Sequence, residues 1–342
     1  MRPSRTASGR ATGSPDPVPH QRRRTITVSL PDIEFTSADH VVQEIRDMNV
    51  KGGSPFGRAA AWAHRWVARE PGLETLDALR DRTADIARQM SNLKPTMATI
   101  ANVNTLVSEA LHTCDGPDEA REVIEALTAR IIDHSYRAVA EVTRVAAELI
   151  PDGGTVLMHS YSSTLVDSYQ AAFDAGKRFS VVCTESRPLR ESLNAVRLLR
   201  EMGCEDVRFV TDAAMAESVK TADIVVLGAD SLSVDGSVAN KIGSFPVALA
   251  ARHYDVPVYV LSELFKYDAR TAQGGAIALE KRDPDEVLAR DDERFVEGMT
   301  VINQFFDLTP ANLIRGLVTE NGVIPPALVS THWNVLREEL LA

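Results

Sequence analysis

The chain has 342 residues, of which 44% are hydrophobic and 25% charged, and its formal net charge is -11. No stretch is apolar over the length needed to cross a bilayer, and the negative charge argues against broad nucleic-acid binding. We therefore expect neither a membrane nor a nucleic acid as a partner. The three cysteines, Cys114, Cys183 and Cys204, have neither disulfide nor metal-ligand spacing. They suit a reducing cytoplasm, and we expect no structural metal.

Residues 1–25 contain six Arg and one Asp and are rich in Ser, Pro and Gly, which predicts a disordered basic head. Residues 26–150 are predicted to form a helical domain. Apolar residues recur there at intervals of three and four in the segments 38–48, 56–70, 75–93 and 117–150. The last segment is expected to be one long helix that ends at a Pro-Asp-Gly-Gly turn.

From residue 151 onward, short apolar runs alternate with helical patterns. Strands are expected at 155–160, 179–186, 207–212, 223–230 and 257–265, with helices at 162–177, 190–204, 213–222 and 240–255. This alternation predicts an α/β fold in which residues 151–342 form a Rossmann-like domain with a doubly wound parallel sheet. Ligands of such sheets bind at the carboxyl ends of the strands. No GxGxxG or Walker loop is present, so we expect no nucleotide cofactor.

The stretch GADSLSVDGSVANKIGS, residues 228–244, carries two candidate features. Asp230 follows an expected buried strand, and partial burial would raise its pKa so that it could act as an acid and a base near neutrality. The alternative is an Asp that caps a turn. Asn240 and Lys241 precede the helix expected next, where a cation is disfavoured by the helix dipole unless a phosphate or sugar hydroxyl binds. The alternative there is a solvated Lys.

Further candidates lie in other predicted loops. The segment Glu185-Ser186-Arg187-Pro188 ends a strand, and Arg suits phosphate recognition, although a capping Ser with an ordinary Glu–Arg pair explains it equally well. The stretch Lys51-Gly52-Gly53 could bring backbone N–H groups close to an anion, or could be only a helix–helix turn. Lys94 before Pro95 could likewise be only a helix stop. Together these features indicate a small, polyhydroxylated, phosphorylated ligand.

Several motifs in a fixed order resemble those of a known superfamily. They are MNVKGGSPFGRAAAWA, LKPT, MHSYSS, TESRP, GADS, NKIGS, SELFK and FDLTPANLIRGLVTENGVIPP, spread from about Val41 to Pro326. The superfamily comprises the alpha, beta and delta subunits of translation initiation factor 2B, methylthioribose-1-phosphate isomerase and ribose-1,5-bisphosphate isomerase, and the last is the most similar in its loops. The resemblance implies a helical domain, a Rossmann-like domain, and homodimers or larger homo-oligomers.

The resemblance also implies roles for single residues. Asp230 matches an acid/base, and the implied contacts of a phosphorylated sugar are Lys51, Gly52, Gly53, Lys94, Glu185, Arg187, Asn240, Lys241 and Lys266. Lys51 and Lys94 stand where Arg is typical, which keeps the charge but loses the two-pronged hydrogen bonding.

The chain departs from the isomerases at Ser160, where they carry a catalytic Cys. A hydroxyl is far less acidic than a thiol, so Ser160 would need a base beside it to carry a proton. Cys183 could substitute, or could be a buried core thiol. The stretch 159–162, HSYS, is similar to the alpha subunits of the initiation factor, which typically have Glu in place of Asp230.

These observations favour an aldose–ketose isomerase that acts on a phosphorylated pentose, such as ribose 1,5-bisphosphate, with Asp230 and Ser160 as the catalytic candidates. The alternative is a non-catalytic regulatory protein that binds a sugar phosphate or nucleotide, like the alpha subunits. A third reading, a guanine-nucleotide exchange component of translation, would require partner subunits.

Overall fold

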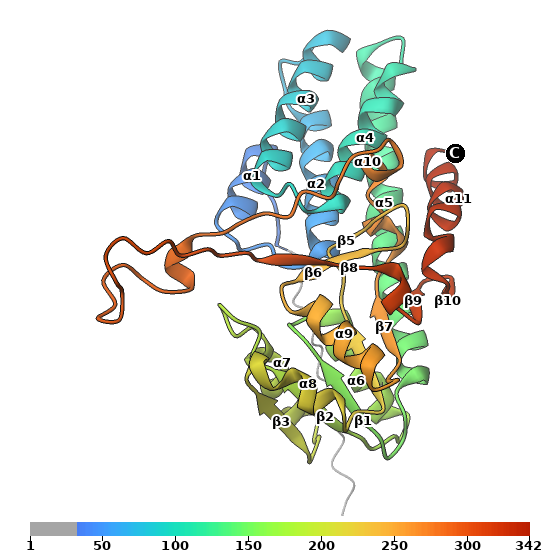
Figure 1. Ribbon diagram of the computed structural model, residues 1–342. Coiled ribbons are helices and arrows are strands. Elements are labelled where there is room, and N and C mark those ends of the chain that lie inside the picture. Colours follow the sequence, from blue (N-terminus) through green and yellow to red (C-terminus); the bar gives the residue numbers. More distant parts are fainter. Residues whose placement is uncertain (1–32) are drawn as a thin grey trace, which may run out of the picture.

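The structure is a computed structural model that describes residues 33–342, and the predicted basic head at 1–25 lies outside these residues (Figure 1). Five helices form the upper part of the molecule in Figure 1. They are α1 (Ala38–Arg46), α2 (Gly53–Arg69), α3 (Leu76–Leu93), α4 (Ala98–His112) and α5 (Pro117–Leu149). The four predicted helical segments are confirmed, and α4 was not among them. The 33-residue α5 runs from the helical part down to the sheet.

A seven-stranded sheet in the order β10-β9-β7-β4-β1-β2-β3 forms the lower part. All neighbouring strands are parallel except β9 and β10, so the predicted α/β fold with a parallel sheet is confirmed. The strands are β1 (Thr155–Met158), β2 (Ser180–Thr184), β3 (Val207–Val210), β4 (Ile224–Leu227), β7 (Val258–Leu261), β9 (Gly316–Thr319) and β10 (Gly322–Ile324). The helices between them are α6 (Ser163–Asp174), α7 (Ser192–Glu201), α8 (Met215–Val219) and α9 (Ser244–His253).

A second, antiparallel sheet of β5 (Ser231–Leu232), β6 (Val238–Lys241) and β8 (Phe306–Thr309) lies beside the first. The prediction that a helix begins at residue 240 is wrong, because Asn240 and Lys241 form the end of β6 and pair with Asp307 and Phe306 of β8. The helix α9 starts only at Ser244. The dipole argument for Lys241 therefore does not apply.

The turn between β6 and α9 explains this shift. Gly243 has φ of 106°, a conformation that breaks the strand before the helix begins. The carboxylate of Asp307 accepts hydrogen bonds from the backbone N–H groups of Gly243 (2.7 Å) and Phe245 (3.1 Å), so a residue of β8 caps α9. A contact across more than sixty residues of sequence, and not the local pattern, fixes where the helix starts.

A long irregular arm, residues 273–305, projects from the body between α10 (Ala269–Ala272) and β8 (Figure 1). Its base is closed by an antiparallel bridge between Lys281 and Gln304 and by a hydrogen bond from the Arg282 N–H to the Asn303 carbonyl (3.1 Å). The arm carries one short 3-10 helix, Pro284–Glu286, and was not anticipated from the sequence.

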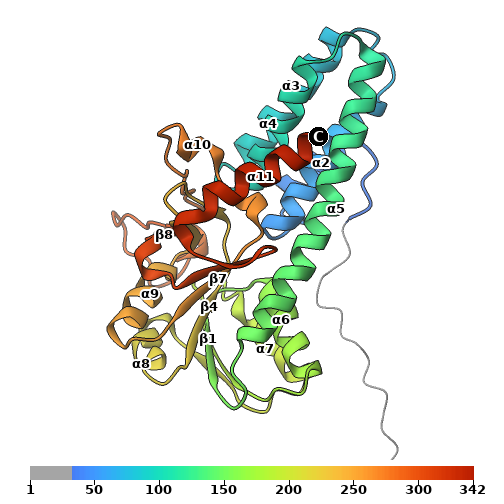
Figure 2. The ribbon, with the colours of Figure 1, turned by 90° about the vertical axis from the view of Figure 1, so that its right-hand side faces the viewer.

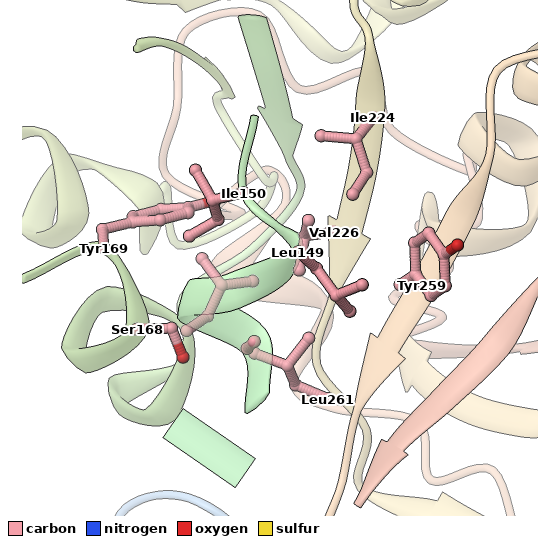
Figure 3. A pocket seen from close by; sticks show the side chains of 10 residues that line it. Leu149, Ile150, Ser168, Tyr169, Ile224, Val226, Tyr259 and Leu261 are labelled. Carbon is pink, nitrogen blue, oxygen red and sulfur yellow. The ribbon is translucent and has the colours of Figure 1, made fainter. Parts of the chain in front are cut away.

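Two apolar clusters hold the fold together. One is continuous from α1–α5 to one face of the sheet, and the other joins α5, α6 and α7 to the opposite face. Inside the second cluster lies a cavity of about 10 Å³ whose lining is almost entirely apolar (Figure 3). It belongs to the core, because it has room for at most one water molecule and offers almost no polar partner.

The C-terminal helix α11 (Val329–Leu341) lies along α5, as Figure 2 shows. Its Trp333 stacks on Tyr267 at 5.6 Å between ring centroids, and the Arg337 guanidinium pairs with Glu109 of α4 at 2.5 Å. The last helix thus packs on the first part of the chain. No helix among residues 33–342 has the length and apolar character of a membrane span.

Candidate functional site

The strand order places a crevice between β1 and β4, where the connections leave the sheet in opposite directions. Met158 of β1 lies opposite Val226 of β4, so both strands end at the same edge. The loops that follow are packed together, since a Cβ added to Gly228 would lie 3.2 Å from the Cβ of Ser162. The site is therefore expected where residues 159–162 and 228–230 meet.

Asp230 lies at this point, half-buried, with its backbone N–H bonded to the Ala239 carbonyl at 2.9 Å. Burial raises the pKa of its carboxyl to about 6, and the nearby ammonium groups of Lys266 and Lys241 partly oppose this effect. An acid with a pKa close to neutrality can both donate and accept a proton under physiological conditions. The role of Asp230 as an acid and a base stays a prediction, which this pKa supports.

Lys266 joins the loop after β4 to the glycine loop of the helical part. It ends the 3-10 helix Leu264–Lys266, is buried, and donates a hydrogen bond from Nζ to the Ala229 carbonyl at 2.9 Å. A Cβ on Gly53 would lie only 2.8 Å from the Lys266 Cε, so the Lys266 side chain packs directly against this glycine and would have to shift for a larger residue. The start of α2, with Gly52 as its N-cap and Lys51 exposed before it, therefore lies beside Asp230.

Lys241 lies on the other side of Asp230 and is buried at the end of β6. Its Nζ is 2.6 Å from Oε1 of Glu191 and 3.1 Å from the centre of the Phe305 ring. Burial lowers the pKa of its ammonium, and the Glu191 carboxylate opposes that effect. Neighbouring Asn240 donates to Ser244 Oγ at 2.8 Å, which ties the strand end to α9.

Lys94 forms the C-cap of α3 at the rim of the site, and burial lowers the pKa of its ammonium. It borders a cavity of about 340 Å³ between the end of α3 and the base of the arm. That cavity is lined by Asn92, Leu93, Lys94, Pro95, Glu280, Lys281, Arg282, Asp283 and Glu286. Burial raises the pKa of the Glu280 carboxyl, whereas the positive charges of Lys94 and Arg282 lower it. Charged groups of both signs therefore face this space.

Arg187 and Glu185 also lie at the rim. The Arg187 guanidinium donates to the carbonyl of Val287 in the arm at 2.9 Å, and Glu185 pairs with Arg190 at 3.4 Å. The Asp212 carboxylate holds the loop by accepting the backbone N–H of Arg187 at 2.8 Å. These contacts of Arg187 and Glu185 thus run to the loop and the arm and do not reach Asp230.

Ser160 is held rigidly beside the crevice. It has φ of 67°, which is strained for a residue with a side chain, and its N–H donates to Ser186 Oγ at 2.7 Å. Neighbouring His159 cannot serve as its base, because its two ring nitrogens contact Thr184 Oγ1 (2.6 Å) and the Ile242 carbonyl (2.7 Å). Burial also lowers the pKa of the His159 imidazole.

Cys183, the other candidate for a second catalytic group, is a core residue. It lies on β2 opposite Met158 and is fully buried, and burial raises the pKa of its thiol to about 12. A thiol with that pKa is almost never ionised at neutral pH, and the side chain lies inside the core. The interpretation as a buried core thiol is therefore correct.

Four side chains of the site were missed from the sequence: Glu191, Glu280, Arg282 and Phe305. Glu191 is the N-cap of α7 and lies four residues beyond the segment that the strand-end rule singled out. The other three come from the arm, for which the sequence offered no strand or helix pattern. Among residues 33–342, no three or more His, Cys, Asp or Glu side chains are grouped so that they could hold a metal ion.

Residues 49–326 match the model of the Initiation factor 2 subunit family. The chain belongs to this family. Over 284 residues it is 32% identical to the ribose 1,5-bisphosphate isomerase of Methanocaldococcus jannaschii, an alignment that covers 83% of this chain and 90% of the relative.

Members of the Initiation factor 2 subunit family with solved structures share the fold. The translation initiation factor eIF-2B of Pyrococcus horikoshii OT3 superposes with a TM-score of 0.72 at 27% identity, covering 84% of this chain and 97% of that one. The 5-methylthioribose 1-phosphate isomerase of the same organism gives 0.67 at 24% identity, covering 88% of each chain. The family resemblance inferred from the motifs is therefore confirmed.

Proposed function

We propose that this protein is an isomerase that converts a phosphorylated pentose from its aldose to its ketose form, with ribose 1,5-bisphosphate or a related sugar 1-phosphate as substrate. The observation that carries the proposal is Asp230, a half-buried carboxyl with a pKa of about 6 between two buried lysines at the strand-end crevice. The relative named ribose 1,5-bisphosphate isomerase, aligned over most of both chains, supports the same reaction.

The reaction requires an acid before hydrogen can move. A phosphate on O1 keeps the sugar in its ring form, so a proton must reach the ring oxygen for the ring to open, and Asp230 is the proposed donor. Hydrogen then passes from C2 to C1, either through an enediolate, which requires a second proton carrier, or as a hydride. Both ring nitrogens of His159 have other partners, so His159 cannot take a proton from Ser160, which favours the hydride route, in which Ser160 needs only to line the site.

The remaining residues are proposed to position the substrate. The start of α2 with Lys51, Gly52 and Gly53 would bind the phosphate on O1, because the N–H groups of a helix N-terminus favour anions. Lys266 would link this loop to Asp230 through the Ala229 carbonyl. The other proposed contacts are Asn240 and Lys241 at the sugar and Lys94, Glu185 and Arg187 at the rim.

We further propose a homodimer or larger homo-oligomer in the cytoplasm, and a helical domain that ends near residue 150. The three cysteines are free thiols and all buried, which suits a reducing compartment. Light scattering on the purified chain would measure the assembly, and a monomer at all concentrations would contradict this proposal.

The decisive test of the function is turnover. Purified protein is incubated with pentose 1-phosphates, and NMR is used to look for the ketose product. We expect a ketose phosphate to form with at least one of them. If none is converted while the protein is folded, the isomerase proposal fails.

A second candidate function is a non-catalytic protein that binds a sugar phosphate or nucleotide. The observation that favours it is Ser160, which has a hydroxyl where an isomerase of this family has a thiol, and no adjacent imidazole nitrogen to activate it. It predicts that phosphorylated sugars or nucleotides raise the melting temperature without being converted.

A further inference from the structure

The two ends of the site differ in whether their cations already have carboxylate partners. At the start of α2 the first turn contains no acidic residue, and the N-cap, Gly52, contributes no side chain. Lys51 is exposed just before it. Helix N–H groups with an ammonium beside them suit one phosphate group. This is the end at which the proposed function places the phosphate on O1.

At the end where Lys241 lies, two cations are already paired. Lys241 contacts Glu191 at 2.6 Å, and Arg282, which lies over the same Phe305 ring at 4.3 Å, contacts Glu286 at 2.6 Å. A second phosphate placed here would have to displace one of these carboxylates or lie against it. Like charges in such a buried setting repel strongly, so this end is poorly suited to a second anion.

Glu191 has, in addition, one carboxylate oxygen that accepts no hydrogen bond from the residues that the structure describes. Its Oε1 accepts from Lys241, whereas its Oε2 is buried and has no hydrogen-bond partner among the residues that the structure describes. A carboxylate oxygen can only accept a hydrogen bond, and leaving it unsatisfied in a buried position is costly. A sugar hydroxyl would supply the missing donor, whereas a phosphate dianion would not.

Lys241 and Phe305 fix the position of this carboxylate. The ammonium is held between the ring face and Oε1, so Glu191 cannot turn to solvent without separating a buried ion pair. The Asp230 N–H donates to the carbonyl of Ala239, which lies two residues before Lys241 on β6, so the Lys241–Glu191 pair lies in the same part of the molecule as the acid. The free oxygen of Glu191 is thus an unsatisfied acceptor held in place beside the candidate site.

We infer that the substrate is a pentose 1-phosphate with a free hydroxyl at its far end, accepted by Glu191, and not a bisphosphate. The inference rests on the proposed function for the reaction and narrows its substrate class to sugars with a single phosphate. It changes the role of Lys241 from a direct contact of the sugar to the residue that holds Glu191 in place.

The test compares two probes, ribose 1-phosphate and ribose 1,5-bisphosphate, in binding and in turnover. Calorimetry should show tighter binding of the monophosphate by at least about tenfold, and kcat/KM should follow the same order if the protein is an isomerase. In Glu191→Gln, which removes the charge and adds a donor, the preference should shift toward the bisphosphate by at least about tenfold. Glu201→Gln, an exposed site at the end of the same helix, is the matched control and should leave the ratio unchanged.

The outcomes separate the two proposals. Equal or tighter binding of the bisphosphate by the unaltered protein would overturn the inference, even if that compound is isomerised. Preferential binding of the monophosphate without turnover would support the inference and contradict the proposal that the protein is an isomerase. If Glu191→Gln fails to fold, the preference of the unaltered protein between the two sugars still decides whether the inference holds. If the unaltered protein binds neither sugar, both proposals are overturned.

Discussion

The loop after β4 and the loop after β1 leave neighbouring strands and differ in what burial does to their polar groups. In the β4 loop, burial raises the pKa of Asp230 to about 6, which brings an acid into the range where it can exchange protons. In the β1 loop, burial lowers the pKa of His159, and its two ring nitrogens are occupied by Thr184 and Ile242, so it cannot take a proton from Ser160. Proton chemistry is therefore concentrated in one loop, and the other serves as a rigid wall.

The strongest way to break this comparison is to remove the acid. Asp230→Asn keeps the size of the side chain and cannot donate the proton, so turnover of a pentose 1-phosphate should fall by about 10²–10⁴-fold. The measurement is the initial rate of ketose formation by NMR, with thermal unfolding as the check that the variant is folded. Retention of full activity would show that Asp230 is not the acid.

The second prediction concerns the rigidity of the β1 loop. In Gly243→Ala the new Cβ would lie 2.6 Å from the His159 ring at φ of 106°, so the free energy of unfolding should fall by about 3 kcal/mol or more. Gly72→Ala is the matched control, because Gly72 has φ of 82° and nothing within 4 Å of an added Cβ. It should cost only about 1 kcal/mol. If urea unfolding shows that both variants lose the same free energy of unfolding, the close contact with His159 does not contribute to the loss in Gly243→Ala.

A third prediction concerns how the free energy of unfolding depends on pH through Asp230 in the β4 loop and Asp307 in β8. Asp230 and Asp307 both have pKa values of about 6 in the folded protein because of burial, against about 3.9 when unfolded. The folded state then binds protons more tightly, so these two groups lower the free energy of unfolding as pH rises from about 4 to about 6. Carboxyl carbon NMR should show two titrations near pH 6, one lost in Asp230→Asn and the other in Asp307→Asn. Midpoints below 4.5 would refute the burial argument.

The smallest effect is expected at Ser160. Because no imidazole nitrogen is available to take its proton, Ser160→Ala should reduce turnover by less than about tenfold. Steady-state rates measured beside those of Asp230→Asn provide the comparison. A loss as large as that of Asp230→Asn would make Ser160 a proton carrier and remove the distinction between the two loops.

Local patterns predicted the helices with one buried face and the short apolar runs that form strands. The α5 helix and the strands β1, β2, β3, β4 and β7 all follow from periodicity and breaking residues. The α4 helix was missed because it is buried on more than one side, with residues such as Ala98, Asn102 and Val103 all inside. A helix surrounded by protein shows no clear polar stripe for the pattern to reveal.

The site was predicted unevenly for the same kind of reason. The strand-end rule located Asp230, since an acid that follows a buried run is visible within a few residues of sequence. It could not locate Glu191 or Phe305, which meet Lys241 only after β6 has paired with β8 and the arm has folded back. The local helical pattern also assigned Lys241 to a helix, because the strand that pairs with it lies more than sixty residues away in the sequence.

The sequence by itself determined the α/β class, the family resemblance and the position of Asp230 directly after a buried strand, because each depends on residues close together in the chain. Tertiary structure alone decided the charge state of the site. Burial sets the pKa of Asp230, the ion pair with Glu191 neutralises Lys241, and the fit of Lys266 against Gly53 brings the glycine loop to the strand ends. Desolvation and ion pairing depend on which groups face one another in space, and no stretch of neighbouring residues records that.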